Sequence, residues 1–306
     1  MLKLGIIGMS EGNGHPYSWS AIINGDFDMR EMDKCGFPCI PLYLDANRDT
    51  LGIEAAQVTH IWTQDRKVSE HIAKASMIEH VTDHAEEMIA QIDAVLLARD
   101  DPENHVAMAK PFLDADIPIF IDKPLAISTK DLTYFTQQNE TGKLVMSCSS
   151  MRYAGECRAV KAELDSLGKI ELATAVGKKD WVKYGVHILE ALFALLDDPK
   201  VISVQYVGQP GKDIVNLKFK NDLPATVHLF MDITPTFQIS LFGRDYWRLI
   251  EIKNSYSMFK ENLVEFIRSV REGRSRLPFE KTKNIIRTLI AAKESLEQGG
   301  KKINLK

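Results

Sequence analysis

The stretch that decides the fold is Ile117-Pro118-Ile119-Phe120-Ile121-Asp122-Lys123-Pro124, a run of large apolar residues followed by an acid, a lysine and a proline. An apolar run without a polar face predicts a buried strand of a parallel sheet. In an open α/β sheet, ligands bind beyond the carboxyl ends of the strands. Lys123 is therefore predicted to direct its ammonium group at a ligand. Taken alone, the segment also fits an ordinary surface lysine in a strand-to-helix loop.

Before this strand, apolar runs alternate with helical segments. The expected strands are Leu2 to Gly8, Val58 to Trp62, Ile78 to Val81 and Ala94 to Ala98, and the expected helices are Tyr17 to Asn24, Ser69 to Ala75, Ala85 to Gln91 and His105 to Leu113. Repeated strand–helix units predict an α/β fold with a doubly wound parallel sheet of the Rossmann type.

Residues 26–57 do not fit this alternation. They join the first helix to the second strand, and they are too long and too apolar for a plain linker. We interpret them as a local insertion on the side away from the ligand crevice. It would pack either on the body of the protein or on a neighbouring subunit.

After Lys123 the pattern changes to a run of strands. The segment first shows a helix over Asp131 to Glu140, a strand over Leu144 to Cys148 and a helix over Glu156 to Leu167. The run of expected strands then comprises Ile170 to Val176, Val201 to Val207, Ile214 to Lys220, Ala225 to Asp232, Gln238 to Phe242 and Trp247 to Ile252. The remaining expected helices are Val182 to Leu196, Met258 to Glu272 and Glu280 to Glu297. Successive strands predict a large, mostly antiparallel open sheet. We therefore place a dinucleotide-binding domain at 1–124 and a second α/β domain at 125–306.

The composition excludes several classes of protein. The 306 residues are 45% hydrophobic and 26% charged, with a formal net charge of −4, so there is no bulk basic field for nucleic acid or an anionic membrane. We expect no signal peptide and no membrane span. The four cysteines suggest neither a disulfide framework nor a zinc site, which predicts reduced thiols in a cytoplasm and no metal.

The first strand-to-helix turn is rich in glycine. Gly8, Gly12 and Gly14 alternate there with Met9, Ser10, Asn13 and His15. Glycines at such a turn let the backbone amides of a helix N-terminus approach a pyrophosphate. The spacing differs from G-x-G-x-x-G, so a glycine-rich turn without a ligand also fits.

Two further strand ends carry candidate cofactor contacts. After the second strand, Asp65 could accept hydrogen bonds from an adenosine ribose, which favours NAD, whereas Arg66 and Lys67 could hold a 2′-phosphate, which favours NADP. A solvated charge run fits equally. After the fourth strand, Arg99, Asp100 and His105 stand at the same edge of the sheet, and His105 taken alone fits a capping or core histidine.

Together these segments resemble the Gfo/Idh/MocA family, which is named after glucose–fructose oxidoreductase, inositol dehydrogenase and rhizopine catabolism proteins. The resemblance covers nearly the whole chain. It rests on the opening strand and glycine loop, Pro102 to His105, Asp122 to Ala126, Arg152-Tyr153 and Gly185 to Glu190. The family motif is usually Glu-Lys-Pro, and here the acid is Asp122.

The resemblance implies NAD(P)-dependent oxidation or reduction of a carbinol on a sugar, cyclitol or sugar nucleotide. It implies that Lys123 lies near the nicotinamide and the reacting hydroxyl, that His187 is the general acid/base, and that Arg152 and Tyr153 border the substrate. A salt-bridged arginine fits Arg152 equally. The family's outer sheet face commonly makes a dimer or tetramer contact. A base near neutrality suits removal of the hydroxyl proton, and a fixed ammonium group suits the developing alkoxide.

One position departs from the family. Many members carry an aspartate four residues before the histidine, and here that residue is Lys183. Lys183 could bind an anionic substrate, take part in proton transfer, mark a loss of turnover, or simply face solvent. Asp180 or Glu190 could supply the missing carboxylate. A dinucleotide-binding regulatory or structural protein without turnover is therefore the alternative to an enzyme.

Overall fold

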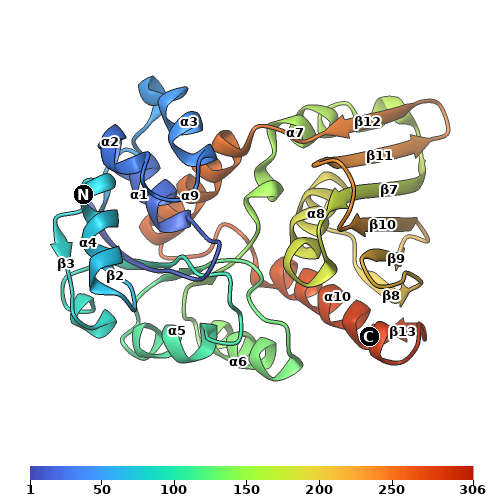
Figure 1. Ribbon diagram of the computed structural model, residues 1–306. Coiled ribbons are helices and arrows are strands. Elements are labelled where there is room, and N and C mark those ends of the chain that lie inside the picture. The colour runs from blue at the N-terminus through green and yellow to red at the C-terminus, as the bar shows by residue number, and fades with distance from the viewer. Residues whose placement is uncertain (306) are drawn as a thin grey trace. The chain divides into compact units, whose positions relative to one another are not determined.

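The computed structural model describes residues 1–305, which form two compact units, each with its own sheet (Figure 1). The first unit comprises residues 1–126, 133–147 and 259–279. The second comprises residues 127–132, 148–258 and those from 280 onward. A single boundary after residue 124 does not describe this division, because the segment 259–279 packs with the first unit.

The sheet of the first unit has the strand order β3-β2-β1-β4-β5-β6. Its strands are β1 (Leu2–Ile7), β2 (Ala56–Trp62), β3 (His80–Val81), β4 (Ala94–Leu97), β5 (Ile119–Ile121) and β6 (Val145–Met146). All five pairings are parallel. The predicted doubly wound Rossmann sheet is confirmed, and its order reverses direction between β1 and β4, where such sheets bind their ligands.

Helices cover both faces of this sheet. They are α1 (His15–Asn24), α4 (Arg66–Ala75), α5 (His105–Asp114), most of α6 (Thr129–Glu140) and most of α9 (Ser255–Glu272). Figure 1 shows α1 and α9 on one face and α5 and α6 on the other. The Phe120 ring of β5 lies 5.4 Å from Trp19 and 5.6 Å from Phe266. These two rings belong to the helices on one face of the sheet, and α5 and α6 cover the other face. Because both faces are covered, β5 has no polar face.

The insertion over 26–57 folds into α2 (Met29–Met32), α3 (Cys39–Asp45) and the short helix η1 (Arg48–Thr50). It packs on its own unit, since the Tyr43 hydroxyl donates to Ser18 at 2.5 Å. A Cβ on Gly14 would lie 2.6 Å from Ile40 and 2.7 Å from Phe37. The insertion therefore packs against the glycine loop within its own unit, and its expected place on the side away from the ligand crevice stays a prediction.

The sheet of the second unit has the order β12-β11-β7-β10-β9-β8-β13. Its strands are β7 (Ile170–Lys178), β8 (Val201–Tyr206), β9 (Lys212–Phe219), β10 (Pro224–Phe230), β11 (Phe237–Gly243), β12 (Trp247–Glu251) and β13 (Ile303–Asn304). All pairings are antiparallel except that of β7 with β10. The large, mostly antiparallel sheet is confirmed. The two residues of β13 were too few to give a sequence pattern.

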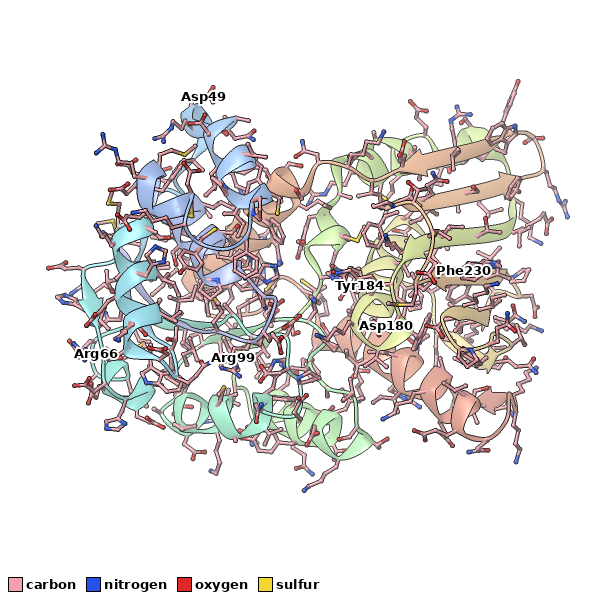
Figure 2. The ribbon with its side chains drawn as sticks, in the orientation of Figure 1. Asp49, Arg66, Arg99, Asp180, Tyr184 and Phe230 are labelled. Carbon is pink, nitrogen blue, oxygen red and sulfur yellow. The ribbon has the colours of Figure 1, made fainter. Side chains whose placement is uncertain are left out.

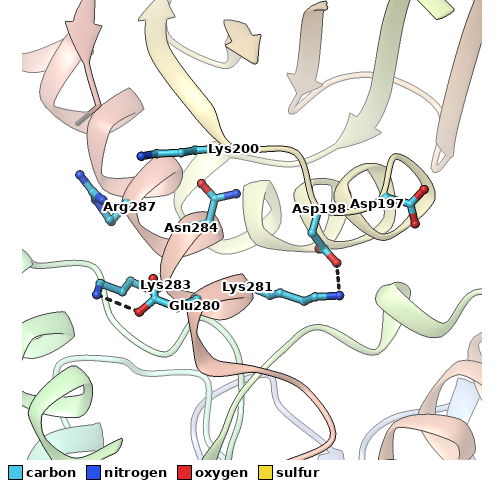
Figure 3. Close-up of a pocket in the computed structure, with 8 residues that line it drawn as sticks. All are labelled: Asp197, Asp198, Lys200, Glu280, Lys281, Lys283, Asn284 and Arg287. Carbon is cyan, nitrogen blue, oxygen red and sulfur yellow. Dashed lines mark hydrogen bonds and ion pairs between the residues drawn. The ribbon is translucent and has the colours of Figure 1, made fainter. Parts of the chain in front are cut away.

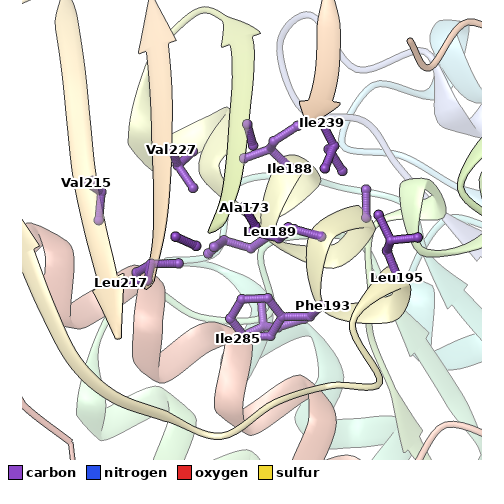
Figure 4. Close-up of a cluster of buried hydrophobic side chains, with 14 of the residues drawn as sticks. Ala173, Ile188, Leu189, Phe193, Leu195, Val215, Leu217, Val227, Ile239 and Ile285 are labelled. Atoms are coloured by element: carbon purple, nitrogen blue, oxygen red, sulfur yellow. The ribbon is translucent and has the colours of Figure 1, made fainter. Parts of the chain in front are cut away.

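One face of this sheet carries the core of the second unit. The helices α8 (Trp181–Leu195) and α10 (Phe279–Glu297) bring Leu189 and Ile285 against Val215 and Val227, and all four side chains are fully buried (Figure 4). Alternate residues of β10 are buried, as a sheet covered on one face requires.

Two expected helices differ in the structure. The segment from Glu156 to Leu167 divides into α7 (Gly155–Lys161) and the 3₁₀ turn η4 (Leu164–Leu167), because Glu163 leaves the helical conformation at φ −111°. The segment from Ala85 forms only the four-residue 3₁₀ turn η2 (Ala85–Met88). A further turn, η3 (Ser150–Tyr153), was not predicted.

Within residues 1–305, no helix combines the length and apolar character needed to cross a bilayer.

We expect Leu189→Ala to lower the free energy of unfolding by about 2–5 kcal/mol, because the truncation leaves a cavity in a close-packed core. The matched control is Leu296→Ala on α10, where the leucine is 48% exposed and little packing is lost. Urea denaturation of both variants measures the difference. Equal losses in the two variants would contradict this location of the core.

Candidate functional site

The glycine loop between β1 and α1 presents free backbone amides. Gly12 has φ +77°, a left-handed conformation that glycine adopts without strain. Within residues 1–305, the N–H groups of Ser10, Glu11, Gly12 and Gly14 make no hydrogen bond. The Glu11 side chain is exposed. Free amides just before a helix form an anion site, so the loop fits a phosphate despite its altered spacing.

Gln64 and Arg99 bind the start of this loop. The Gln64 side chain accepts the Met9 N–H at 3.0 Å and donates to the Met9 carbonyl at 2.6 Å. The Arg99 guanidinium, labelled in Figure 2, donates to Gln64 at 2.9 Å and to the Met9 carbonyl at 3.1 Å. Sequence reasoning missed Gln64. Its position two residues beyond the end of β2 is the signal that could have identified it.

Asp65 and Arg66 have local structural partners. Asp65 caps α4 by accepting the Lys67 N–H at 2.9 Å. Arg66, exposed on α4 in Figure 2, pairs with Glu70 at 3.0 Å and also with Asp83. These contacts favour the interpretation of a charged helix start, and they leave the choice between NAD and NADP open.

His105 connects two loops of the first unit. Its side chain is fully buried, and its two ring nitrogens lie 2.8 Å from the carbonyl oxygen of Arg99 and 3.1 Å from that of Leu125. Because both nitrogens face the backbone, the placement supports a structural role. A cofactor contact for His105 stays a prediction, and the structure favours the alternative of a core histidine.

Asp122 is the centre of the hydrogen bonds around the glycine loop. It is 1% exposed, and its Oδ2 lies 2.8 Å from Asn13 Nδ2 and 2.5 Å from His15 Nδ1. Its Oδ1 accepts the Lys123 N–H at 2.8 Å. Burial by itself raises the pKa of a carboxyl group, but the charge and hydrogen bond of His15, with Lys123 and Asn13, lower the pKa of Asp122 to about 2.

Lys123 is held beside the same loop. Its side chain is 8% exposed, and its Nζ lies 3.5 Å from Asp100 Oδ2. The other oxygen of Asp100 accepts the Ser10 hydroxyl at 2.5 Å. Two carboxylates, Asp100 and Asp122, thus connect the glycine loop to the lysine segment. The structure brings together the predicted residues Ser10, Asn13, His15, Asp100, Asp122 and Lys123.

His187 lies on α8 in the second unit and is partly buried. Its Nδ1 is 2.6 Å from the Ser149 Oγ. Its ring centre lies 5.1 Å from that of Tyr184 and 6.3 Å from that of Phe237. Tyr184 in turn meets Lys179, whose Nζ is 2.5 Å from its hydroxyl. Sequence reasoning missed Ser149, although it stands just after β6, at the carboxyl edge of a strand.

The start of α8 explains the position of Lys183. Asp180 caps the helix by accepting the Lys183 N–H at 3.0 Å, and Figure 2 shows Asp180 and Tyr184 at this end. The Lys183 side chain is exposed. The Asp180 carboxylate is therefore engaged with the backbone at the start of α8.

Arg152 is buried in a charge network. Its Nε donates to Glu190 and its Nη2 to Asp198 at 2.6 Å, with 7% of the side chain exposed. Burial raises the pKa of Glu190 to about 7 against the opposing charge of Arg152. These ion pairs favour the alternative of a salt-bridged arginine, and a place for Arg152 at the substrate stays a prediction.

Tyr153 lies next to this network. The residue is 9% exposed, and the Arg158 guanidinium lies 5.2 Å from the centre of its ring. A place for Tyr153 at the substrate stays a prediction.

A charged cavity of about 370 Å³ is lined by Asp198, one of the two carboxylate partners of Arg152 (Figure 3). Its lining residues are Asp197, Asp198, Lys200, Glu280, Lys281, Lys283, Asn284 and Arg287. Each carboxylate is paired, with Lys281 2.7 Å from Asp198, Lys283 3.0 Å from Glu280 and Lys161 2.6 Å from Asp197. The cavity extends the Arg152 network to α10. Within residues 1–305, no three metal-binding side chains are grouped to hold an ion.

We expect Asp122→Asn to destabilise the protein at neutral pH by roughly 2 kcal/mol, as follows from a pKa lowered from 3.8 to about 2. The carboxylate stabilises the folded state above its ordinary pKa, and this contribution is lost as pH falls toward 2. The stability difference between parent and variant should therefore shrink below about pH 4. Urea denaturation across pH measures it, with the exposed Asp49→Asn as the control. A difference that does not change with pH would contradict the shifted pKa.

Comparison with known proteins agrees with this geometry. Residues 39–148 match the family described as "Oxidoreductase family, NAD-binding Rossmann fold". No curated protein matches the chain in sequence.

Solved structures match the chain over its full length. A putative myo-inositol dehydrogenase from Sinorhizobium meliloti has a TM-score of 0.79 at 14% identity, covering 100% of both chains. A probable dehydrogenase from Thermotoga maritima has a TM-score of 0.78 at 14% identity, covering 99% of this chain and 98% of its own. A myo-inositol dehydrogenase from Lactobacillus casei, solved with NAD(H) and myo-inositol, has a TM-score of 0.77 at 16% identity, covering 100% and 97%.

At these identities the structural likeness shows the fold, and the family match covers the Rossmann segment. The resemblance that the sequence motifs indicated agrees with this match, which places residues 39–148 against the NAD-binding Rossmann model of the Gfo/Idh/MocA oxidoreductases.

Proposed function

We propose that the protein is a cytoplasmic NAD(P)-dependent oxidoreductase that transfers hydride between a nicotinamide cofactor and a carbinol or carbonyl of a sugar, cyclitol or sugar nucleotide. The observation that carries the proposal is the pair of carboxylates, Asp100 and Asp122, that hold Lys123 beside a loop with free amides. The Lactobacillus casei relative of the same fold was solved with NAD(H) and myo-inositol, which supports this class of cofactor and substrate.

The residues of the glycine loop fit a dinucleotide. The free N–H groups of Ser10, Glu11, Gly12 and Gly14 would hold the pyrophosphate, because they are unpaired donors at a helix N-terminus. Gln64, next to the end of β2, would meet the adenosine ribose, with Asp65 and Arg66 beyond it. When bound, the nicotinamide supplies the acceptor or donor of hydride.

The side chains of the protein supply the proton chemistry and the charge. His187 takes the proton of the substrate hydroxyl in oxidation and returns it in reduction. The Lys123 ammonium stabilises the negative charge that develops on the same oxygen. Lys183 lies one helical turn before His187, and its exposed ammonium group would bind an anionic substituent, as on a uronic acid or a nucleotide diphosphate.

We expect Lys123→Ala and His187→Ala each to lower kcat by about 10²-fold or more, the usual loss for a group that moves a proton or stabilises charge. The assay follows NAD or NADP reduction with a panel of cyclitols, sugars and sugar nucleotides that includes myo-inositol and scyllo-inositol. The exposed Lys130→Ala serves as the lysine control and should keep the parent rate. If both site variants reduced cofactor at the parent rate, the assignment would fail.

A second candidate is a dinucleotide-binding regulatory or structural protein without turnover. It is favoured by the Gln64 side chain, which engages both the N–H and the carbonyl of Met9, and by Lys183, which stands where many members of the resembled family carry an aspartate. Cofactor binding without reduction by any substrate of the panel would support it. No binding of either dinucleotide would exclude both candidates.

We also propose that the protein forms a homodimer or homotetramer through the outer face of its second sheet. Phe242 and Trp247 pair across β11 and β12 and are 40% and 59% exposed, and nearby Leu249 is 53% exposed. Exposed large apolar side chains gathered on one sheet face are typical of a contact with another protein surface.

We expect Trp247→Glu combined with Leu249→Glu to shift the protein toward the monomer, because two charges would be buried in the contact. Sedimentation velocity over a range of concentrations measures the shift. Leu42→Glu, at a leucine that is 69% exposed on α3, is the control and should keep the parent assembly. A parent protein that sediments as a monomer would exclude this contact.

A further inference from the structure

His15 begins α1 directly after the glycine loop, and its ring is fixed on several sides. Its Nδ1 lies 2.5 Å from Asp122 Oδ2. One face of the ring stacks on Trp19, with the ring centres 4.5 Å apart and the planes 14° from parallel, and the Phe259 ring meets it edge-on at 5.1 Å. All four residues belong to the first unit. The imidazole therefore has a defined position and rotation beside the loop.

The Asp122 carboxylate decides which nitrogen of this ring carries a proton. Its oxygens accept the Asn13 side-chain amide at 2.8 Å and the Lys123 N–H at 2.8 Å, and its pKa is lowered to about 2, so the group is ionised at neutral pH. An ionised carboxylate can only accept hydrogen bonds. The His15 Nδ1 therefore carries a proton and donates it to Asp122. The Nε2 atom carries a lone pair in the neutral ring and a second proton in the charged ring.

The Nε2 atom of His15 is open to a ligand. Within residues 1–305 it makes no hydrogen bond, and the side chain is 19% exposed. The N–H group of Gly14, the preceding residue, is also without a hydrogen bond there, and Glu11, the charged residue of the loop, is exposed. A ring that is already immobilised loses little rotational freedom when a ligand binds to its open edge, so the contact has a small entropic cost.

The charged groups near the ring come from the segment after β5 and from the loop after β4. Asp122 contacts the ring, and Lys123 follows it in the chain, with its Nζ 3.5 Å from Asp100 Oδ2. On α9, Lys260 stands next to the contacting phenylalanine, but its ammonium group donates to the backbone of the insertion. Two carboxylates and one ammonium group together carry one negative charge, which the imidazolium form of His15 balances.

We propose that His15 binds a phosphate group of the dinucleotide: held by Asp122 through Nδ1, its ring takes up a proton on Nε2 and directs this N–H at a phosphate oxygen. The inference rests on the proposed function, and it adds a residue that links cofactor binding to a proton. The proton comes from solvent, and no covalent bond of the cofactor forms or breaks.

The strength of this contact depends on the charge of the ring. An imidazolium N–H on a phosphate is a charge-assisted hydrogen bond, which is about twice as strong as a neutral one. The neutral ring would instead turn the lone pair of Nε2 toward the phosphate oxygen. The affinity for the dinucleotide therefore falls as pH rises and His15 loses this proton.

Isothermal titration calorimetry of the full chain with NADH and with NADPH measures the proton directly. Titrations in phosphate-free buffers of different ionisation enthalpy, from about pH 6 to about pH 9 to span the titration of an imidazole, count the protons taken up on binding. We expect uptake by the parent within this range and an affinity that falls as pH rises, because the complex holds more protons than the separate molecules.

Two variants separate the ring nitrogens. His15→Asn keeps an amide donor beside Asp122 in place of Nδ1 and leaves no group at the place of Nε2. It should bind the dinucleotide about tenfold more weakly at the acidic end of the range and lose the proton uptake, because a charge-assisted hydrogen bond is removed. His15→Gln places a neutral amide near Nε2, so it should regain part of the affinity without the proton uptake. The control is His80→Asn on β3, where the side chain is 50% exposed, and it should match the parent.

Thermal unfolding identifies which variants are folded, and the folded ones decide the result. Parent affinity with parent proton uptake in a His15 variant would overturn the inference and leave the proposed function standing. A weaker affinity with unchanged proton uptake would also overturn it, because the contact would not be ionic. If proton-linked binding is lost in the variants but the parent turns over no substrate of the panel, the role of His15 stands and the proposed oxidoreductase function fails. A parent protein that binds neither dinucleotide would overturn both.

Discussion

The buried carboxylate of Asp122 is the interaction on which the candidate cofactor site depends. A carboxylate removed from water is unfavourable unless donors surround it, and this one is met by Asn13, His15 and the N–H of Lys123. Two of these donors belong to the glycine loop, and the third belongs to the residue with the proposed chemical role. The loop and the lysine are therefore fixed together. Asp100 forms a second connection between them, because it accepts the Ser10 hydroxyl of the loop and pairs with the Lys123 ammonium group.

The second unit uses the same principle around Arg152. The guanidinium lies between Glu190 on α8 and Asp198 in the segment after it, so it ties η3 to the helix that carries His187. An arginine fork can satisfy two carboxylates at once, which a lysine cannot do with comparable geometry. The consequence is that both carboxylates are unavailable to the imidazole, which is held by a neutral hydroxyl instead.

The insertion over 26–57 shows how a local addition can serve the site. Phe37 and Ile40 fill the space beside Gly14 that a larger residue would need. Glycine is required at position 14 because two apolar side chains approach it closely. The backbone conformation of Gly14 does not itself require glycine, because it lies outside the left-handed region. The longer spacing of the loop and the presence of the insertion are therefore two parts of one packing arrangement.

The sequence by itself determined the parallel sheet, the antiparallel sheet and the residues at the strand ends. Buried strands such as β5 need continuous apolar runs, and half-covered strands such as β10 need alternation, so both leave a local signal. The loop residues Asn13 and His15 and the acid Asp122 were also found from their positions alone. Only the tertiary structure decided that both ring nitrogens of His105 face the backbone, that Arg152 pairs with Glu190 and Asp198, that Gln64 binds the loop, and that Ser149 contacts His187. Each of these contacts joins a side chain to a residue that is distant in the sequence or to a backbone carbonyl group. A single hydrogen bond of this kind produces no repeating pattern of apolar residues, so the sequence alone does not reveal it.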